Sequence, residues 1–204
     1  MSFDRITIFL MVLGLMVIAI GCGEDGGPSG PEVTAESLVE DGWELFAAEE
    51  YEAALDLFLD ATEKNHNYSD AYNGAGWCSG KIPGLLSEAS NHFARSFGLD
   101  TTRYDALGGW TFVVYQSGQW DAAIGKADSL LHRRPVWQFL RQPSIDFHDI
   151  WLVEASAYCH LGNYDRALEI IIEHLNNSFD ADPSTPAGRR EILDEIERLG
   201  RVYG

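Results

Sequence analysis

Histidine, cysteine and paired acidic residues are the side chains that could do chemistry in this chain. There are six histidines and three cysteines, with no HExxH or CxxC motif among them. Cys159 adjoins His160, but neighbouring residues on a helix point in different directions, so this pair does not have the arrangement of a nucleophile and its base. Asp56 and Asp60 lie four residues apart, a spacing typical of a solvated helix face in an acidic chain. We therefore expect no enzyme activity, no metal and no cofactor.

Cys22 follows a segment with the pattern of a signal peptide. Residues 6–20 carry no charge and are almost entirely apolar. This run is shorter than the ~20 residues of a membrane-spanning helix, but it has the length of a signal-peptide core. Its end, Ala19-Ile20-Gly21-Cys22, resembles the bacterial lipobox, which implies that the cysteine receives a diacylglyceryl group and becomes the new N-terminus. The alternatives are an ordinary secreted protein with a free Cys22 and an uncleaved anchor.

A tether is expected after the lipidated cysteine, because residues 23–31 are rich in glycine and proline and contain no apolar side chain. The expected organisation is a lipoprotein signal peptide at 1–21, the lipidated cysteine and a flexible linker at 22–33, and a folded domain at 34–204. In the lipoproteins that the motif resembles, aspartate directly after the cysteine favours the inner membrane; here that residue is Gly23. We expect a lipid-anchored location in the bacterial cell envelope, with the outer membrane favoured, facing the periplasm or the cell surface.

The acidic balance of the chain limits its partners. Its formal net charge is -18 at pH 7. This argues against binding to nucleic acid and against electrostatic adhesion to anionic lipids. We interpret the charge first as a solvated surface that keeps the protein soluble, and second as a means of attracting a basic partner.

A short phrase that recurs along the chain predicts the elements that position any site. A turn residue, an aromatic residue and an acid come before an alanine and an aliphatic residue, and Ala54, Ala123 and Ala167 occupy the alanine position. With Ala89 these anchors are spaced 35, 34 and 44 residues apart. Self-similarity at this period is typical of a helical solenoid, in which stacked helix pairs bury a continuous core. The sequence therefore predicts an all-α fold.

The repeated residues resemble those of the tetratricopeptide repeat, a unit of two antiparallel helices. The first unit supplies the apolar, small and aromatic positions of that family as Leu38, Gly42, Leu45, Tyr51, Ala54, Phe58 and Ala61. The resemblance implies a right-handed superhelical solenoid of about four such units. We expect a C-terminal capping helix, with Thr185 as its N-cap and Pro186 as its first residue. Its apolar stripe would be formed by Ile192, Leu193, Ile196 and Leu199. Cys78 and Cys159 fall in non-adjacent units, so we expect two small buried hydrophobes and no disulfide.

The resemblance also implies where a ligand would bind, because in that family the first helices of the units line a concave groove. The residues that map to this face and that we expect to bind are Trp43, Phe46, Asn73, Trp77, Phe112, Tyr115 and Ser156. Trp43, Trp77 and Phe112 occupy equivalent positions and would form a ladder of contact anchors. The alternative is that they pack between neighbouring first helices as part of the core. Asp70, Asp105 and Asp149 also recur at equivalent positions near helix starts, where we interpret them first as capping residues.

The long interval before Ala167 reflects an insertion within residues 136–148. It contains Trp137, Phe139, Leu140 and Phe147. This composition is unusually apolar for a loop, and an exposed loop of this kind would be prone to association or aggregation. One interpretation is a lid over the far end of the groove. The other, which we favour, is an extension packed against adjacent helices, with one edge facing a ligand.

The expected function is that of a protein-protein interaction scaffold or assembly subunit of the cell envelope. Its partners would be other envelope proteins or peptide segments, and the membrane through the lipid on Cys22, with no nucleic acid. The alternative is a lipoprotein that binds a glycan or a small apolar ligand in the aromatic groove. An enzyme whose residues escape recognition is the third hypothesis.

Overall fold

The computed structural model describes residues 32–203. The predicted signal peptide, Cys22 and most of the linker lie outside these residues and stay predictions. Within the described part, no helix is both long and apolar enough to cross a bilayer. The helices are α1 (Ala35–Ala47), α2 (Tyr51–Lys64), α3 (Ser69–Lys81), α4 (Leu86–Leu99), α5 (Tyr104–Gln116), α6 (Trp120–Arg133), α7 (Phe147–His160), α8 (Tyr164–Ile170) with a π-helical continuation at Ile171–Leu175, and α9 (Pro186–Tyr203).

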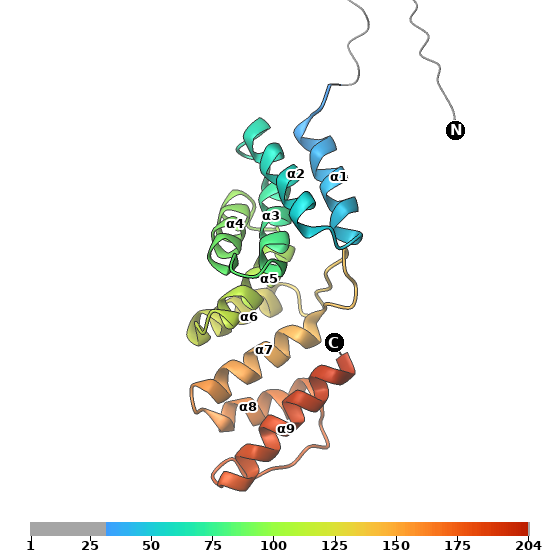
Figure 1. Cartoon of the computed structure of the whole chain (residues 1–204). Helices are drawn as coiled ribbons and strands as arrows, with labels where there is room; N and C mark the ends of the chain where they lie inside the picture. Colours follow the sequence, from blue (N-terminus) through green and yellow to red (C-terminus); the bar gives the residue numbers. More distant parts are fainter. Residues whose placement is uncertain (1–31, 204) are drawn as a thin grey trace, which may run out of the picture. The chain divides into compact units, whose positions relative to one another are not determined.

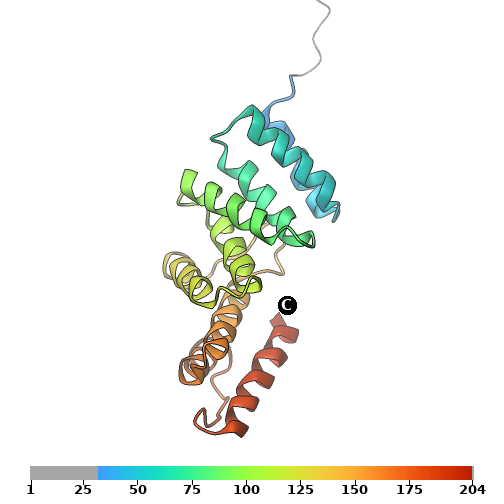
Figure 2. The same cartoon turned by 60° about the vertical axis from the view of Figure 1, so that its left-hand side comes forward.

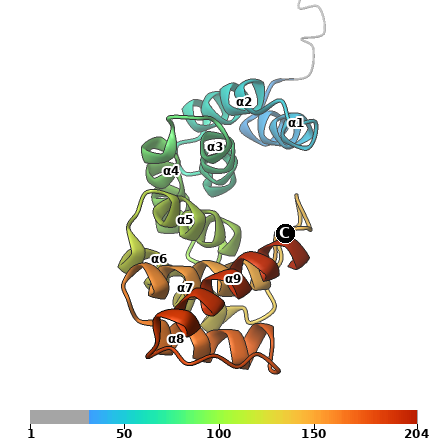
Figure 3. The same ribbon diagram turned by 60° about the horizontal axis from the view of Figure 1, so that its bottom comes forward.

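The helices stack in chain order as four pairs followed by α9 (Figures 1 and 2). Within the described residues, the first helices α1, α3, α5 and α7 also contact the first helix of the neighbouring pair. The second helices instead pack against the first helix on either side of them, so the first helices form the inner layer and the second helices the outer one (Figure 3). This arrangement confirms the predicted right-handed solenoid of four units with a capping helix.

Small residues on the inner layer make room for large aromatic rings from the outer layer. The ring of Phe58 on α2 is fully buried, and a Cβ added at Gly74 on α3 would lie 2.2 Å from its Cε1. Phe93 repeats this one unit later, since a Cβ at Gly109 on α5 would lie 2.3 Å from its Cζ. The predicted alanine anchors are likewise fully buried. Alternating small and large residues therefore fixes how closely successive helices approach.

The capping helix begins as expected. The Thr185 hydroxyl accepts a hydrogen bond of 3.0 Å from the Gly188 amide, and Pro186 is the first helical residue. Ile192 and Leu199 are buried against the preceding helices, but Leu193, which we expected on the same apolar stripe, is 45% exposed. The reason is the 100° turn between neighbouring helix positions, which carries Leu193 off the stripe that faces α7 and α8.

Both cysteines in the described part of the chain are buried and unpaired, which confirms the expectation for Cys78 and Cys159. Burial raises the pKa of the Cys78 thiol to about 12 and that of Cys159 to about 11. Because only the thiolate is a nucleophile, these side chains act as small hydrophobes.

Candidate functional site

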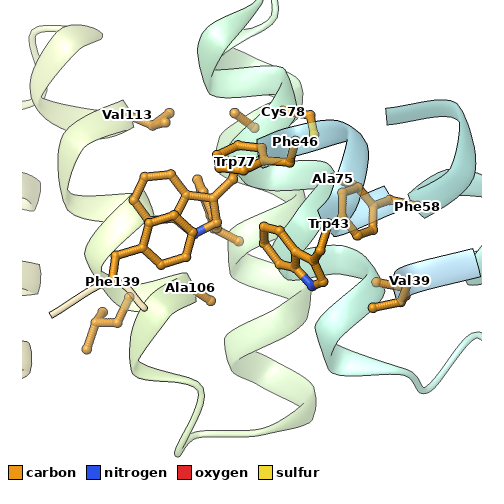
Figure 4. Close-up of a cluster of buried hydrophobic side chains, with 14 of the residues drawn as sticks. Val39, Trp43, Phe46, Phe58, Ala75, Trp77, Cys78, Ala106, Val113 and Phe139 are labelled. Atoms are coloured by element: carbon orange, nitrogen blue, oxygen red, sulfur yellow. The ribbon is translucent and has the colours of Figure 1, made fainter. Parts of the chain in front are cut away.

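The inner layer carries a cluster of aromatic side chains at the first three units. Trp43 and Phe46 on α1 and Trp77 on α3 surround Phe139, which comes from the connection between α6 and α7 (Figure 4). The Phe139 ring stacks on Trp77 with centroids 4.0 Å apart and planes only 7° from parallel. Its centroid lies 6.1 Å from each of the Trp43 and Phe46 rings, at edge-to-face angles. Both arrangements are favourable for aromatic pairs, so the four rings form one interlocked group.

These aromatic residues contact the protein's own chain rather than an open groove. Trp43, Phe46 and Trp77 are only 3%, 4% and 5% exposed. Phe112 on α5 is half-buried, with its ring 6.3 Å from that of Trp77, so the structure places three equivalent rings as the sequence predicts but covers two of them. Packing as core is therefore what this conformation shows, and their role in ligand binding stays a prediction.

The remaining predicted groove residues are divided between this cluster and the following units. Asn73 lies on α3 one turn before Trp77 and is 1% exposed. Tyr115 is half-buried at the end of α5, where it packs on Trp120 with ring centroids 5.2 Å apart. Ser156 is half-buried on α7. The structure thus groups Trp43, Phe46, Asn73 and Trp77, and leaves Tyr115 and Ser156 outside the aromatic cluster.

The cover over the groove is the non-helical part of the insertion, residues 136–146, here called the inserted segment. It packs on α1, α3 and α5, so it is the packed extension that we favoured and not a lid at the far end of the groove, but these helices are remote from it in the sequence and are not the adjacent ones that we expected. Phe139 is fully buried within it. Trp137 lies over Gly108, where an added Cβ would be 2.6 Å from its Cη2. The last two residues of the predicted insertion, Phe147 and His148, open α7 instead.

Two aspartates on the inner layer hold tryptophan side chains in place. Asp70 accepts hydrogen bonds from the Trp43 indole (3.3 Å) and the Asn73 amide (3.2 Å), and Arg103 lies 3.4 Å from the same carboxylate. Asp105 accepts a 3.0 Å bond from the Trp137 indole. Burial raises the pKa of Asp105, while that hydrogen bond and the Arg103 charge oppose the rise. Asp70 and Asp105 thus occupy the same position in successive units, and they hold Trp43 of the groove and Trp137 of the inserted segment in place.

The outer side of the inserted segment presents basic and apolar groups. Leu140 is 76% exposed, and the Arg141 guanidinium lies 5.0 Å from the Trp43 ring centroid. Two clefts of about 420 and 410 Å³ flank Leu140, and both are also lined by Arg103. Asp70 and Asp105 line these clefts together with the arginines, and Arg103 is ion-paired with Asp70, so basic and acidic groups are mixed here.

An apolar cavity of about 190 Å³ lies beside the cluster, between α3, α4 and α5. Trp77, Phe93 and Phe112 supply aromatic walls, and Ile145 of the inserted segment and Asp149 of α7 line another part. Among residues 32–203, no three side chains of the metal-ligating types lie close enough together to hold an ion. The cavity therefore offers apolar contact, with Lys81, Gln116 and Asp149 as polar groups in its wall, and no described metal site.

Sequence reasoning missed Trp137, Phe139 and Arg141 as parts of this site, although it singled out their segment as too apolar for a free loop. It also read Asp70 and Asp105 as helix-terminal residues first. The signals that pointed to them were the recurrence of aspartate at one repeat position and the aromatic content of the insertion.

The sequence matches no family model and no curated protein. Two crystal structures of MamA match the structure with TM-scores of 0.59 and 0.57 at 17% and 16% sequence identity. They cover 82% and 80% of this chain, and 75% and 81% of the matched chains. A tetratricopeptide repeat protein from Parabacteroides merdae ATCC 43184 matches with a TM-score of 0.54 and 15% identity, over 82% of this chain and 59% of that one.

The protein has the fold of a tetratricopeptide-repeat solenoid. At these identities the likeness concerns the fold alone. Within this tetratricopeptide-repeat solenoid, the inner helices α1, α3 and α5 form a groove whose aromatic floor is occupied by a segment of the same chain. The distinctive feature of the site is therefore its own insertion.

Proposed function

We propose that the protein is a lipid-anchored scaffold of the bacterial cell envelope, whose inner helix layer binds a segment of another envelope protein. The observation that carries the proposal is the seating of residues 136–146, since this groove accepts a non-helical stretch of polypeptide and buries its aromatic side chains. Aromatic residues in a concave surface are the usual anchors of protein interfaces. The tetratricopeptide-repeat fold and the lipobox-like sequence before Cys22 support the same role.

In-cell photocrosslinking tests the binding part of the proposal. A photoreactive amino acid at Leu140, which is 76% exposed beside the groove, should give an adduct with one partner protein. The matched control is Leu59, an exposed leucine on the outer helix α2. An adduct from position 140 and none from position 59 is the expected result. Equal labelling from both positions would contradict binding at the inner layer.

The anchoring part is tested at Cys22. Replacing Cys22→Ser removes the thiol that lipidation requires, so the variant should lose labelling by an alkyne fatty acid and leave the membrane fraction. Retention of the variant in membranes would point to an uncleaved anchor instead. A second variant, Gly23→Asp, places aspartate after the cysteine and should move the protein from the outer to the inner membrane. An unchanged distribution would contradict the outer-membrane assignment.

The cavity of about 190 Å³ favours a second candidate function, which is binding of a small apolar ligand. Concave sites lined mainly by apolar and aromatic side chains are the usual binding sites of small ligands, and three aromatic rings line this one. Phe112→Trp would fill part of this space, because Phe112 lines it. Ligand-detected NMR with benzene or indole should then show binding to the parent protein and none to the variant. Equal signals from both proteins would remove this candidate.

A further inference from the structure

The inserted segment is seated in the groove as a ligand would be, by alternate side chains. Trp137 is 5% exposed and Phe139 fully buried, whereas their neighbours Val136 and Leu140 are 77% and 76% exposed and Gln138 is also exposed. An alternation of period two is the pattern of an extended chain with one face buried. The groove therefore holds an extended stretch through two aromatic residues at positions i and i+2.

The segment's backbone is hydrogen-bonded to itself and not to the groove. The Phe139 amide donates to the Ile145 carbonyl at 2.9 Å, and the Ile145 amide donates to the Gln142 carbonyl at 2.9 Å. Within residues 32–203, no backbone hydrogen bond joins residues 136–146 to α1, α3 or α5. The specific polar links to these helices are made by side chains, from Trp137 to Asp105 and from Arg141 to the face of Trp43. Removing the segment would therefore break no backbone ladder.

The groove floor keeps hydrogen-bonding capacity that the segment does not use. The Trp77 indole N–H and the side-chain Oδ1 of Asn73 are both buried on α3, and neither has a hydrogen-bond partner among the described residues. Because these residues are four apart on one helix, they lie on the same face. Buried polar groups without partners cost free energy, about 1–3 kcal/mol each. That cost would be removed by a polypeptide whose carbonyl accepted a hydrogen bond from the Trp77 indole and whose N–H donated one to Asn73 Oδ1.

From these three observations we propose that residues 136–146 are a displaceable internal ligand, and that the groove's external ligand is an extended protein segment bearing aromatic side chains two residues apart. The inference rests on the proposed scaffold function and deepens it, because it names the chemistry of the partner. It also names a closed state, in which residues 136–146 fill the groove and limit binding of the partner. A partner that pairs with Trp77 and Asn73 replaces the inserted segment. In the partner's absence the segment keeps the aromatic floor out of water.

The magnitude of this inhibition follows from the population of the open groove. A minor conformation is commonly populated at about 0.1–10%. The apparent dissociation constant of an external ligand rises by the reciprocal of that fraction, so emptying the groove should tighten binding about 10- to 1,000-fold. The tethered segment competes at an effective concentration in the range of millimolar, which a partner must overcome.

Peptide binding tests the proposal directly. The probe is a synthetic peptide with the sequence of residues 134–146, and the control peptide has alanine at both aromatic positions. Phe139→Ala removes the anchor of the tethered segment and should bind the probe at least 10-fold more tightly than the parent protein. Val136→Ala changes a residue of the same segment that is 77% exposed and should match the parent. A folded Phe139→Ala protein that binds the probe no better than the parent would overturn the proposal, as would equal binding of both peptides.

Hydrogen exchange on the parent protein decides the question even if the Phe139→Ala variant fails to fold. Adding the probe should displace the inserted segment, so the amides of Phe139 and Ile145 should exchange at least about 10-fold faster while those of α3 do not. Unchanged or slower exchange at these two amides would overturn the displacement. If position 140 gives an adduct in cells but the Phe139→Ala protein does not bind the probe, the scaffold function would stand and the internal-ligand mechanism would be removed.

Discussion

Replacing Glu154→Gln should change how the stability of this protein depends on pH. Glu154 lies in the middle of α7, is fully buried, and neither of its carboxylate oxygens has a hydrogen-bond partner among the described residues. Burial raises its pKa from the ordinary 4.5 to about 7; Asp128 on α6 adds to the rise, and Arg166 on α8 opposes it. The folded protein therefore favours the protonated form of Glu154. Above neutral pH the side chain becomes charged, and the buried charge destabilises the folded state.

The size of the effect follows from linkage. The folded-state pKa lies above the unfolded-state value, so this group's contribution is fully present below pH 4.5 and is lost as the pH rises to about 7. One pKa unit corresponds to about 1.4 kcal/mol, so the complete loss is about 3 kcal/mol, of which about 2.5 kcal/mol falls between pH 5 and pH 8. Glutamine does not titrate and should be free of this loss.

The assay is urea unfolding of residues 23–204 at pH 5 and pH 8. The unfolding free energy of Glu154→Gln, relative to the parent, should increase by about 2.5 kcal/mol between the two pH values, or roughly 5–10 °C in melting temperature. Glu191→Gln, at an exposed position on α9, is the matched control and should show the parent's pH dependence. A difference between Glu154→Gln and the parent that is the same at both pH values would refute the reasoning.

Two further predictions follow from packing and burial. Gly74→Ala should destabilise the fold by about 1–3 kcal/mol, because its Cβ would lie 2.2 Å from Phe58, whereas Gly125→Ala, with open space around it in α6, should stabilise it by about 0.5–1 kcal/mol. Thermal melts of both variants check this pair, and equal effects would contradict the packing argument. In a protein of residues 23–204, Cys78 and Cys159 should not react with Ellman's reagent at pH 8 until guanidinium is added, because burial raises both thiol pKa values. Rapid labelling of the folded protein would instead show that the helices carrying these cysteines open.

Much of the fold could be predicted because its determinants are local and repeated. Ala54 and Phe58 on one helix and Gly42 and Gly74 on its neighbours recur at the period of the repeat, and each repeat contacts mainly the next one along the chain. The turn positions follow the same logic. Gly118 and Gly162 both have positive φ, as the turn between paired helices requires, and Glu49 adopts the same conformation in the first unit.

The candidate site was predictable only in part, because its occupant is remote in the sequence. The mapping placed Trp43, Phe46 and Trp77 on one face, and the structure brings them together. Whether that face is open depends on Phe139, which no repeat position specifies. The sequence favoured a packed segment but gave the adjacent helices as its partners, whereas Phe139 packs on α1 and α3.

The sequence by itself determined the helices, their pairing and the small-to-large packing between the two layers, since hydrophobic periodicity and residue size act over a few residues or one repeat. It also supplied the lipobox-like motif at Cys22. Only the tertiary structure decided that the inserted segment lies in the groove, that Asp105 holds Trp137, and that Glu154 is buried without a partner. The reason is that these contacts join helices that are distant along the chain, and their free energies depend on which surfaces the solenoid brings together.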